Sequence, residues 1–181
     1  MTELQPKPKL ATVWLDGCSG CHMSFLDLDE KLIDIVTRAD LVYSPLVDNK
    51  IFPEMVDVTL VEGAVSSEGD LEKIQHIRAH TKFLVSLGDC AVTANVPSMR
   101  NPFGAPAILK RAYIENVTLN PQIPNQVVPP LLKKVVPVHQ VVKVDVFVQG
   151  CPPSAETIGY VVMELLDGRM PDLTGKTRFG A

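Results

Sequence analysis

The sequence lacks a hydrophobic run long enough to span a membrane, and it lacks a surplus of charge of one sign. No run approaches the ~18 consecutive apolar residues that crossing a bilayer requires. Its 17 basic and 21 acidic residues leave a net charge of −4, which gives no electrostatic reason to bind nucleic acid or an anionic membrane. We also find no internal repeat and no low-complexity tract. A membrane-spanning, nucleic-acid-binding or fibrous protein is therefore not expected.

An export signal is also missing at the start of the sequence. Residues 1–9 contain neither an apolar export core nor a twin-arginine pair. We therefore expect a cytoplasmic protein, in which thiols stay reduced. In that compartment the four cysteines indicate metal binding or redox chemistry before disulfides.

The chain has the length and apolar content of one globular domain. Its 181 residues are close to the usual ~150 residues per domain, and 46% of them are hydrophobic. The sequence predicts a single domain over residues 1–181, with tails at 1–9 and 169–181.

Short apolar runs alternate with amphipathic stretches, which predicts an α/β fold: a parallel sheet with helices on both faces. The apolar runs place strands at residues 10–15, 41–47, 58–61, 82–87 and 144–148. Spacing of three and four residues predicts one helix of about four turns through residues 25–36. Further helices are expected after Gly69-Asp70, over residues 107–115 and after Pro152-Pro153-Ser154. We expect Trp14 and Phe25 to lie in the core.

The pattern dissolves between residues 117 and 142. Five of the chain's 15 prolines lie there: Pro121, Pro124, Pro129, Pro130 and Pro137. A connection of this length is usually functional or an interaction surface, although a solvated excursion is the simpler alternative. His139 lies in it and is a candidate for contact with a partner.

Each cysteine follows the carboxyl end of a predicted strand. Cys18 and Cys21 follow the first strand, Cys90 the fourth and Cys151 the fifth. Loops at this edge of an open α/β sheet converge on one crevice, so four thiolates can meet although they are far apart in sequence. The neighbouring glycines allow close backbone approach and N–H groups directed at sulfur. They are Gly17, Gly20, Gly88 and Gly150.

Four thiolates can hold an iron–sulfur cluster or zinc, or they can be incidental buried thiols. Structural zinc sites usually take two close Cys pairs, whereas this chain has one pair and two distant singles. Pro152 directly after the last cysteine also favours a cluster. The run CSGCH at residues 18–22 matches a c-type haem attachment motif, but haem would leave Cys90 and Cys151 unexplained. A thioredoxin-like site and a flavin at this loop are disfavoured.

Several polar residues near the cysteines have two interpretations. Ser19 can donate a hydrogen bond to cluster sulfur or pass protons toward a partner, or it is a plain turn residue. We interpret His22 as a solvent-facing residue or a neighbour of the ligands, since four thiolates already complete a cluster. His76 and His80 share a helix face without further candidate ligands, which favours a solvated face over a metal site.

Four segments carry a family resemblance. They are residues 14–27 (WLDGCSGCHMSFLD), 61–64 (VEGA), 87–91 (LGDCA) and 144–153 (VDVFVQGCPP). Together they resemble the small subunit of [NiFe] hydrogenases, and the first motif and short length are most similar to the cytoplasmic NAD-reducing, bidirectional type. The resemblance extends over about the whole chain.

This resemblance implies a flavodoxin-like domain with three α/β/α layers. It implies one [4Fe–4S] cluster bound by the four cysteines, with Glu62 as a candidate for proton transfer or large-subunit contact; a surface carboxylate is the alternative. The chain would have no catalytic centre of its own. It would relay electrons between a large Ni–Fe subunit and a diaphorase module with FMN, further clusters and the NAD site, in a hetero-oligomer that performs H2 + NAD+ = H+ + NADH.

Two alternatives to this function remain at the level of sequence. The 20 kDa subunit of complex I shares the later motifs, but it resembles a tandem Cys-Cys where this chain splits the pair with Ser19-Gly20. A zinc-stabilised interaction module is the alternative from another class. The chain also lacks the second domain of longer small subunits and has no cysteines for further clusters.

Overall fold

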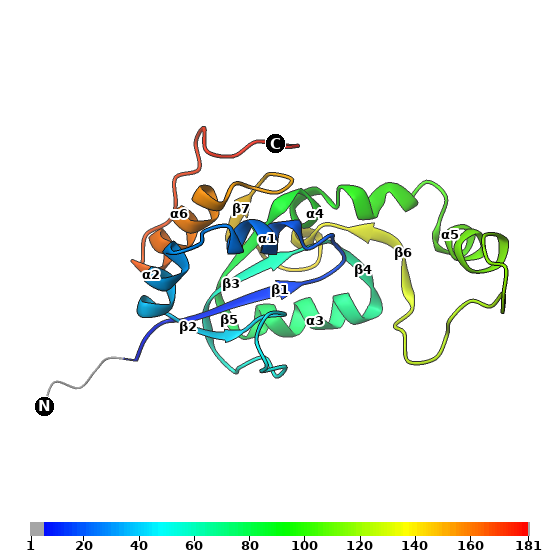
Figure 1. Ribbon diagram of the computed structural model, residues 1–181, viewed down its shortest axis with the longest axis horizontal. Helices are drawn as coiled ribbons and strands as arrows, with labels where there is room; N and C mark the ends of the chain where they lie inside the picture. Colours follow the sequence, from blue (N-terminus) through cyan, green and yellow to red (C-terminus); the bar gives the residue numbers. More distant parts are fainter. Residues whose placement is uncertain (1–5, 181) are drawn as a thin grey trace, which may run out of the picture.

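The computed structural model describes residues 6–180 and contains a five-stranded parallel sheet. Its strands are β1 (Lys9–Trp14), β2 (Asp40–Tyr43), β3 (Val56–Glu62), β5 (Thr81–Leu87) and β7 (Val146–Val148). They lie in the order β2-β1-β3-β5-β7, and every neighbouring pair is parallel (Figure 1). Counted within this sheet, the order is 2-1-3-4-5, which is the flavodoxin-like order with its switch point between β1 and β3. The predicted fold class is confirmed.

Helices cover both faces of the sheet. One face holds α1 (Gly20–Leu26), α2 (Lys31–Arg38) and α6 (Ala155–Leu166), and the other holds α3 (Glu68–Ala79) and α4 (Gly88–Thr93). Alternate side chains of β3 enter the two cores, since Val58 and Leu60 pack with α1 and α6 while Val61 packs with α3. The result is two hydrophobic cores separated by the sheet, as expected of an α/β/α sandwich.

The helix predicted through residues 25–36 is wrong, because the structure has two helices there. The chain turns between α1 and α2, and Asp29 takes a positive φ of 49° that no continuous helix permits. Leu28 in this turn packs onto Gly159 of α6, where any side chain would stand 2.7 Å from a Leu28 methyl carbon. The apolar spacing of three and four residues continues through this turn, because Leu28 is buried in the turn just as it would be on the inner face of a helix.

The stretch predicted as an irregular connection, residues 117–142, contains regular structure. Strand β6 (Leu131–Val136) pairs antiparallel with the short β4 (Val65–Ser67), and a 3₁₀ helix, η3, follows at Val138–Gln140. Arg100 donates to carbonyls of both strands, to Ser66 at 2.9 Å and Leu132 at 3.0 Å. This small sheet therefore supports a lobe formed by η1 (Val96–Arg100), α5 (Ala105–Lys110) and the π-helical turn η2 (Arg111–Glu115).

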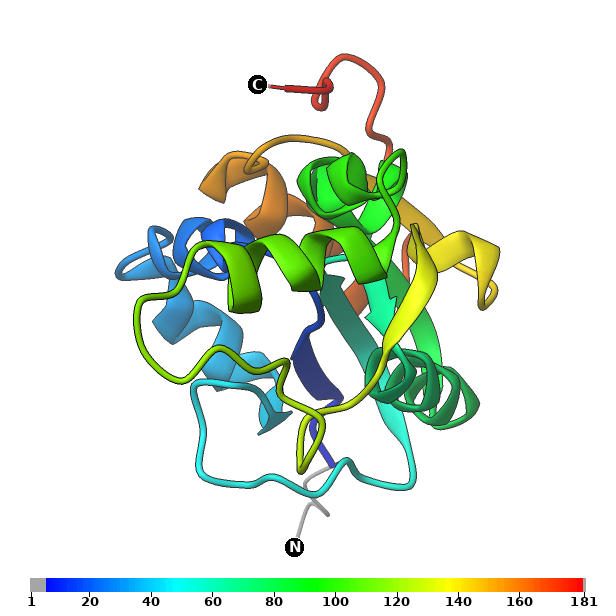
Figure 2. The ribbon, with the colours of Figure 1, turned by 90° about the vertical axis from the view of Figure 1, so that its right-hand side faces the viewer.

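The lobe forms one end of the molecule, opposite α2 and α6 (Figure 1). Viewed from that end, α5 and η2 lie in front of the sheet and the loop that leads to β6 curves beneath them (Figure 2). The predicted helix over residues 107–115 corresponds to α5 and η2, and it begins two residues earlier.

Two predicted core residues have different outcomes. Phe25 is buried as predicted, but Trp14 is 45% exposed and the prediction for it is wrong. Trp14 ends β1 at the cysteine edge, where its Nε1 donates to the Gly17 carbonyl at 3.1 Å. Across residues 6–180, no helix combines the length and apolar character needed to cross a membrane.

Candidate metal centre

The structure brings the four cysteines to one edge of the sheet. Cys18 lies in the loop after β1, Cys21 in the first turn of α1, Cys90 in the first turn of α4, and Cys151 shortly after β7. All four carry free thiols, and all line one cavity of about 70 Å³. The predicted convergence at the carboxyl edge is therefore present. The same cavity is also lined by Gly20, Glu62, Asp89, Gly150 and Pro152.

Glycine is required where the backbone passes closest to a sulfur. Gly88 has a φ of +82°, and a Cβ there would lie 2.2 Å from the Sγ atom of Cys21. A Cβ on Gly20 would lie 3.2 Å from the Sγ atom of Cys18. A side chain at Gly88 would collide with the Cys21 sulfur and one at Gly20 would crowd the Cys18 sulfur, so glycine lets the backbone approach both sulfurs closely.

N–H groups point at three of the four sulfurs. The Gly20 amide donates to Cys18 Sγ at 3.4 Å, and the Asn95 side-chain amide donates to Cys151 Sγ at 3.8 Å. The backbone amide of Val96 donates to Cys90. Such N–H···S bonds stabilise anionic sulfur, which is the form that binds iron or zinc.

The protein itself disfavours free thiolates in this cavity. Burial raises the pKa of the Cys21 thiol, and the nearby charges of Glu62 and the other three cysteines raise it further. Burial likewise raises the pKa of Cys90, although the Val96 amide opposes it. Four thiolates at this position therefore require a compensating positive charge, as bound metal ions would provide.

A buried polar chain fixes Glu62 on the cavity wall. Its Oε2 atom accepts the His22 backbone amide at 2.9 Å and contacts His22 Nδ1. On the other side of the ring, His22 Nε2 lies 3.1 Å from the Thr12 hydroxyl, which itself donates to Ser44 at 2.7 Å. The Thr12 hydroxyl therefore links the His22 ring to Ser44. All four residues are buried.

The arrangement of the four thiols can be compared with what different metal groups require. Among residues 6–180, no three Cys, His, Asp or Glu side chains stand close enough together to hold a single metal ion. A tetrahedral zinc site would need four such donors around one point. Four thiols that line one cavity supply as many sulfur donors as a zinc ion or an iron–sulfur cluster takes.

Ser19 and the four histidines are the other polar residues that the sequence singled out. Ser19 takes a positive φ of 66° immediately before α1, which is a turn conformation. His22 is buried against Glu62 and does not face solvent. His139 is exposed at the edge of Phe147, and His76 and His80 stack on each other on α3 and the residue after it.

Sequence reasoning missed three contributors to the site: Asp89, Asn95 and Val96. Asp89 was visible in the LGDCA motif, but its carboxylate turns to Gly150 and not to solvent. Asn95 and Val96 lie after α4, where Ala94 takes a positive φ of 63° and redirects the chain across the cavity. The sequence contains no glycine there to signal that turn.

The fold and the site define a class: a flavodoxin-like α/β protein that presents four free thiols at the carboxyl edge of its sheet. Comparison with known proteins agrees. Residues 18–165 match the family model for the 20 kDa subunit of NADH ubiquinone oxidoreductase. The NAD-reducing hydrogenase HoxS subunit delta of Cupriavidus necator is 42% identical, over 92% of this chain and 82% of that subunit.

Solved structures agree with the sequence matches. A structure of an NAD+-reducing [NiFe]-hydrogenase in the H2-reduced state superposes with a TM-score of 0.90 at 34% identity, covering 96% of this chain and 99% of that one. An F420-non-reducing hydrogenase of Methanothermobacter marburgensis contains a subunit that is 39% identical, but this chain spans only 56% of its length. The chain belongs to the NADH ubiquinone oxidoreductase 20 kDa subunit family, and within it to the small subunits of NAD-reducing [NiFe] hydrogenases.

Proposed function

We propose that Cys18, Cys21, Cys90 and Cys151 hold one [4Fe–4S] cluster, through which this subunit relays electrons in an NAD-reducing [NiFe] hydrogenase. The observation that carries the proposal is the convergence of four thiols on one cavity with N–H donors directed at three of them. When bound, the cluster supplies reversible one-electron transfer.

The chain's own residues bind the cluster and modify its electrostatic surroundings. The thiolates hold the iron, and the amides of Gly20, Asn95 and Val96 stabilise negative charge on three of the ligand sulfurs. The fixed carboxylate of Glu62 lies at the same cavity and acts in the opposite direction, since an anion there disfavours reduction. Glu62 and Ser19 remain our candidates for proton transfer toward the partner.

The proposed partners follow from the number of cysteines. With four cysteines in all, the chain can hold one cluster, so electrons must enter and leave through other polypeptides. We propose a Ni–Fe large subunit on one side and a diaphorase module with FMN and further clusters on the other. We place this complex in the cytoplasm, where NAD+ is available as the acceptor.

Serine substitution of each cysteine tests the cluster. We expect every single variant, purified without oxygen together with its partners, to lose iron, acid-labile sulfide and H2-dependent NAD+ reduction. Wild-type protein with zinc and no sulfide would establish the zinc module instead, and a sharp haem band would establish a cytochrome. Reduction of a quinone in place of NAD+ would favour the complex I-like alternative. Normal iron and activity in all four variants would refute the assignment.

A further inference from the structure

The Asp89 carboxylate joins three separate segments beside the cysteines. Its Oδ1 atom accepts the Gly150 backbone amide at 2.8 Å, and its Oδ2 atom accepts the Gly180 backbone amide at 2.7 Å. In return, the Asp89 amide donates to the Gly150 carbonyl at 2.9 Å. Asp89 is almost fully buried, so these bonds form away from bulk water.

The reciprocal bonds with Gly150 fix two cysteine-bearing segments relative to each other. Asp89 directly precedes Cys90, and Gly150 directly precedes Cys151. Gly150 has a φ of +142°, and a Cβ there would lie 2.5 Å from Pro153, so a tight turn forms at this point. The Gly150 amide, which sequence reasoning directed at sulfur, is bonded to Asp89 instead.

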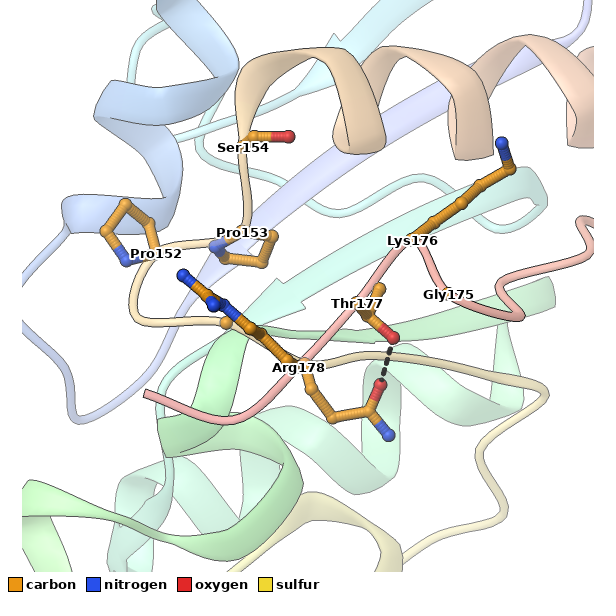
Figure 3. A pocket seen from close by; sticks show the side chains of 9 residues that line it. Pro152, Pro153, Ser154, Gly175, Lys176, Thr177 and Arg178 are labelled. Atoms are coloured by element: carbon orange, nitrogen blue, oxygen red, sulfur yellow. Dashed lines mark hydrogen bonds between the residues drawn. The ribbon is translucent and has the colours of Figure 1, made fainter. Parts of the chain in front are cut away.

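The second oxygen of Asp89 holds the segment 173–180, which we call the strap. The strap runs past the loop after β7, and Thr177 donates to the Gln149 side chain at 2.9 Å (Figure 3). Thr157 of α6 donates to the Lys176 carbonyl at 3.2 Å. The strap and the residues around Cys151 line a pocket of about 600 Å³, with the side chains of Lys176 and Arg178 in its wall (Figure 3).

A carboxylate next to four thiolates is electrostatically unfavourable unless its contacts compensate. Two backbone amides on its two oxygens provide that compensation as charge-assisted hydrogen bonds. The carboxylate thereby connects the Cys90 segment, the Cys151 segment and the strap at a single side chain.

We propose that Asp89 is a positioning residue for the metal centre. It sets the separation of Cys90 and Cys151, and it holds the strap against the loop that carries Cys151, which the strap steadies through its bond to Gln149. This inference rests on the proposed cluster, because the group being positioned is bound by those two cysteines.

Asp89→Asn tests the inference in the holo-complex, with Asp16→Asn as the matched charge control. An asparagine offers one acceptor oxygen, so one of the two amides loses its partner. Asp16 also precedes a cysteine loop and is tied to Ala64 through backbone atoms alone. We expect iron release to a chelator to rise at least about tenfold in Asp89→Asn, the size of a lost charge-assisted bond. The EPR signal of the reduced cluster should also change shape, while Asp16→Asn changes neither.

Two further variants distinguish the effect of Asp89 on the cysteine segments from its effect on the strap. Thr177→Val removes the strap's bond to Gln149 but leaves Asp89 intact, so we expect faster iron release with an unchanged EPR signal. Asp89→Glu keeps both acceptor oxygens and should restore part of the lost retention.

The outcomes distinguish this inference from the proposed function. Wild-type protein without iron and sulfide would overturn the cluster itself. A wild-type cluster whose EPR signal and iron release are the same in Asp89→Asn and Asp16→Asn would overturn the positioning role alone. If Asp89→Asn does not fold, Thr177→Val decides the strap: unchanged iron release would refute it.

Discussion

The buried hydroxyl of Thr12 helps to orient Glu62 in the wall of the cysteine cavity. The Thr12 hydroxyl stands between His22 and Ser44, and through His22 it determines the orientation of Glu62. A hydroxyl that is bonded to two buried neighbours cannot be replaced by an apolar group of the same shape without leaving both neighbours unpaired.

Thr12→Val should therefore reduce the free energy of unfolding by about 1–3 kcal/mol, the usual cost of unsatisfied buried polar groups. Thr12→Ser, which keeps the hydroxyl, is the control and should lose much less. Urea denaturation of the metal-free chain measures both. A valine variant as stable as the wild type would contradict the hydrogen-bonded chain.

A second prediction concerns the steric contact between a side chain at position 88 and the sulfur of Cys21. Gly88→Ala places a methyl group against Cys21 Sγ, whereas Gly168→Ala, at a similar φ of +74°, meets nothing within 4 Å. Both substitutions should cost about 1–2 kcal/mol for the left-handed backbone. Only Gly88→Ala should also prevent metal binding, as measured by iron and sulfide content. Equal iron retention in both variants would contradict the contact.

At this scale, the sequence was sufficient to predict that the four cysteines converge, but not which residues surround them. The cysteines were predictable because each follows a strand, and parallel strands end at one edge. The amides of Asn95 and Val96 were not, because a turn at Ala94 brings them to the sulfurs and alanine gives no turn signal. Asp89 was not either, since its partners Gly150 and Gly180 are remote in sequence.

At the scale of elements, local signals determined what could be predicted. The helices α3 and α6 were predictable, and α3 begins with Ser67 and Asp70 in a capping box. Strand β6 was not, because its sequence LLKKVV does not alternate and prolines flank it. It is held by tertiary contacts such as that of Asn101, which both donates to and accepts from the Val135 backbone.

The contact of α3 with the strands β5 and β7 allows a prediction about pH. Burial would raise the pKa of the Asp145 carboxyl, but the Leu84 amide and Arg78 outweigh it and hold that pKa below its usual range. A carboxyl with a lowered pKa stabilises the fold above its unfolded pKa of about 3.9, and this contribution disappears as the pH falls below that value.

Asp145→Asn should therefore lower the free energy of unfolding at pH 7 by about 1–3 kcal/mol, since Arg78 loses its anionic partner. The difference from the wild type should shrink as the pH falls below about 4. Denaturation curves at pH 7 and pH 3 measure it, with the exposed Asp48→Asn as the control. A difference that stays constant with pH would contradict this assignment.

On the scale of the whole molecule, one group of exposed apolar side chains lies on the lobe at one end and in the loop that leads from it to β6. Phe103 is 69% exposed, Leu119 is 82% exposed, and Val127 is fully exposed. These residues lie on or around α5 and η2 and in the loop before β6 (Figure 2). Large exposed apolar patches are characteristic of interaction surfaces and promote association when uncovered.

The isolated chain should accordingly self-associate through the lobe. The double variant Phe103→Ser/Leu119→Ser should remain monomeric at higher concentrations, as measured by light scattering. The matched control is Ile33→Ser/Val36→Ser, which replaces exposed apolar residues of α2 at the other end of the molecule (Figure 1). Equal behaviour of the two double variants would exclude the lobe as the associating surface.

The wide separation of the cysteines along the chain determines when during biosynthesis the thiols can meet. Cys18 and Cys21 are synthesised before most of the sheet, but Cys151 follows β7, the last of the five sheet strands along the chain. Until β7 joins the edge of the sheet beside β5, one corner of the site is missing. Insertion of the proposed cluster therefore has to follow synthesis of Cys151 and pairing of β7 with β5. A delivery factor that requires all four thiols would consequently act only on chains whose five-stranded sheet has formed, and would not act on nascent or misfolded chains.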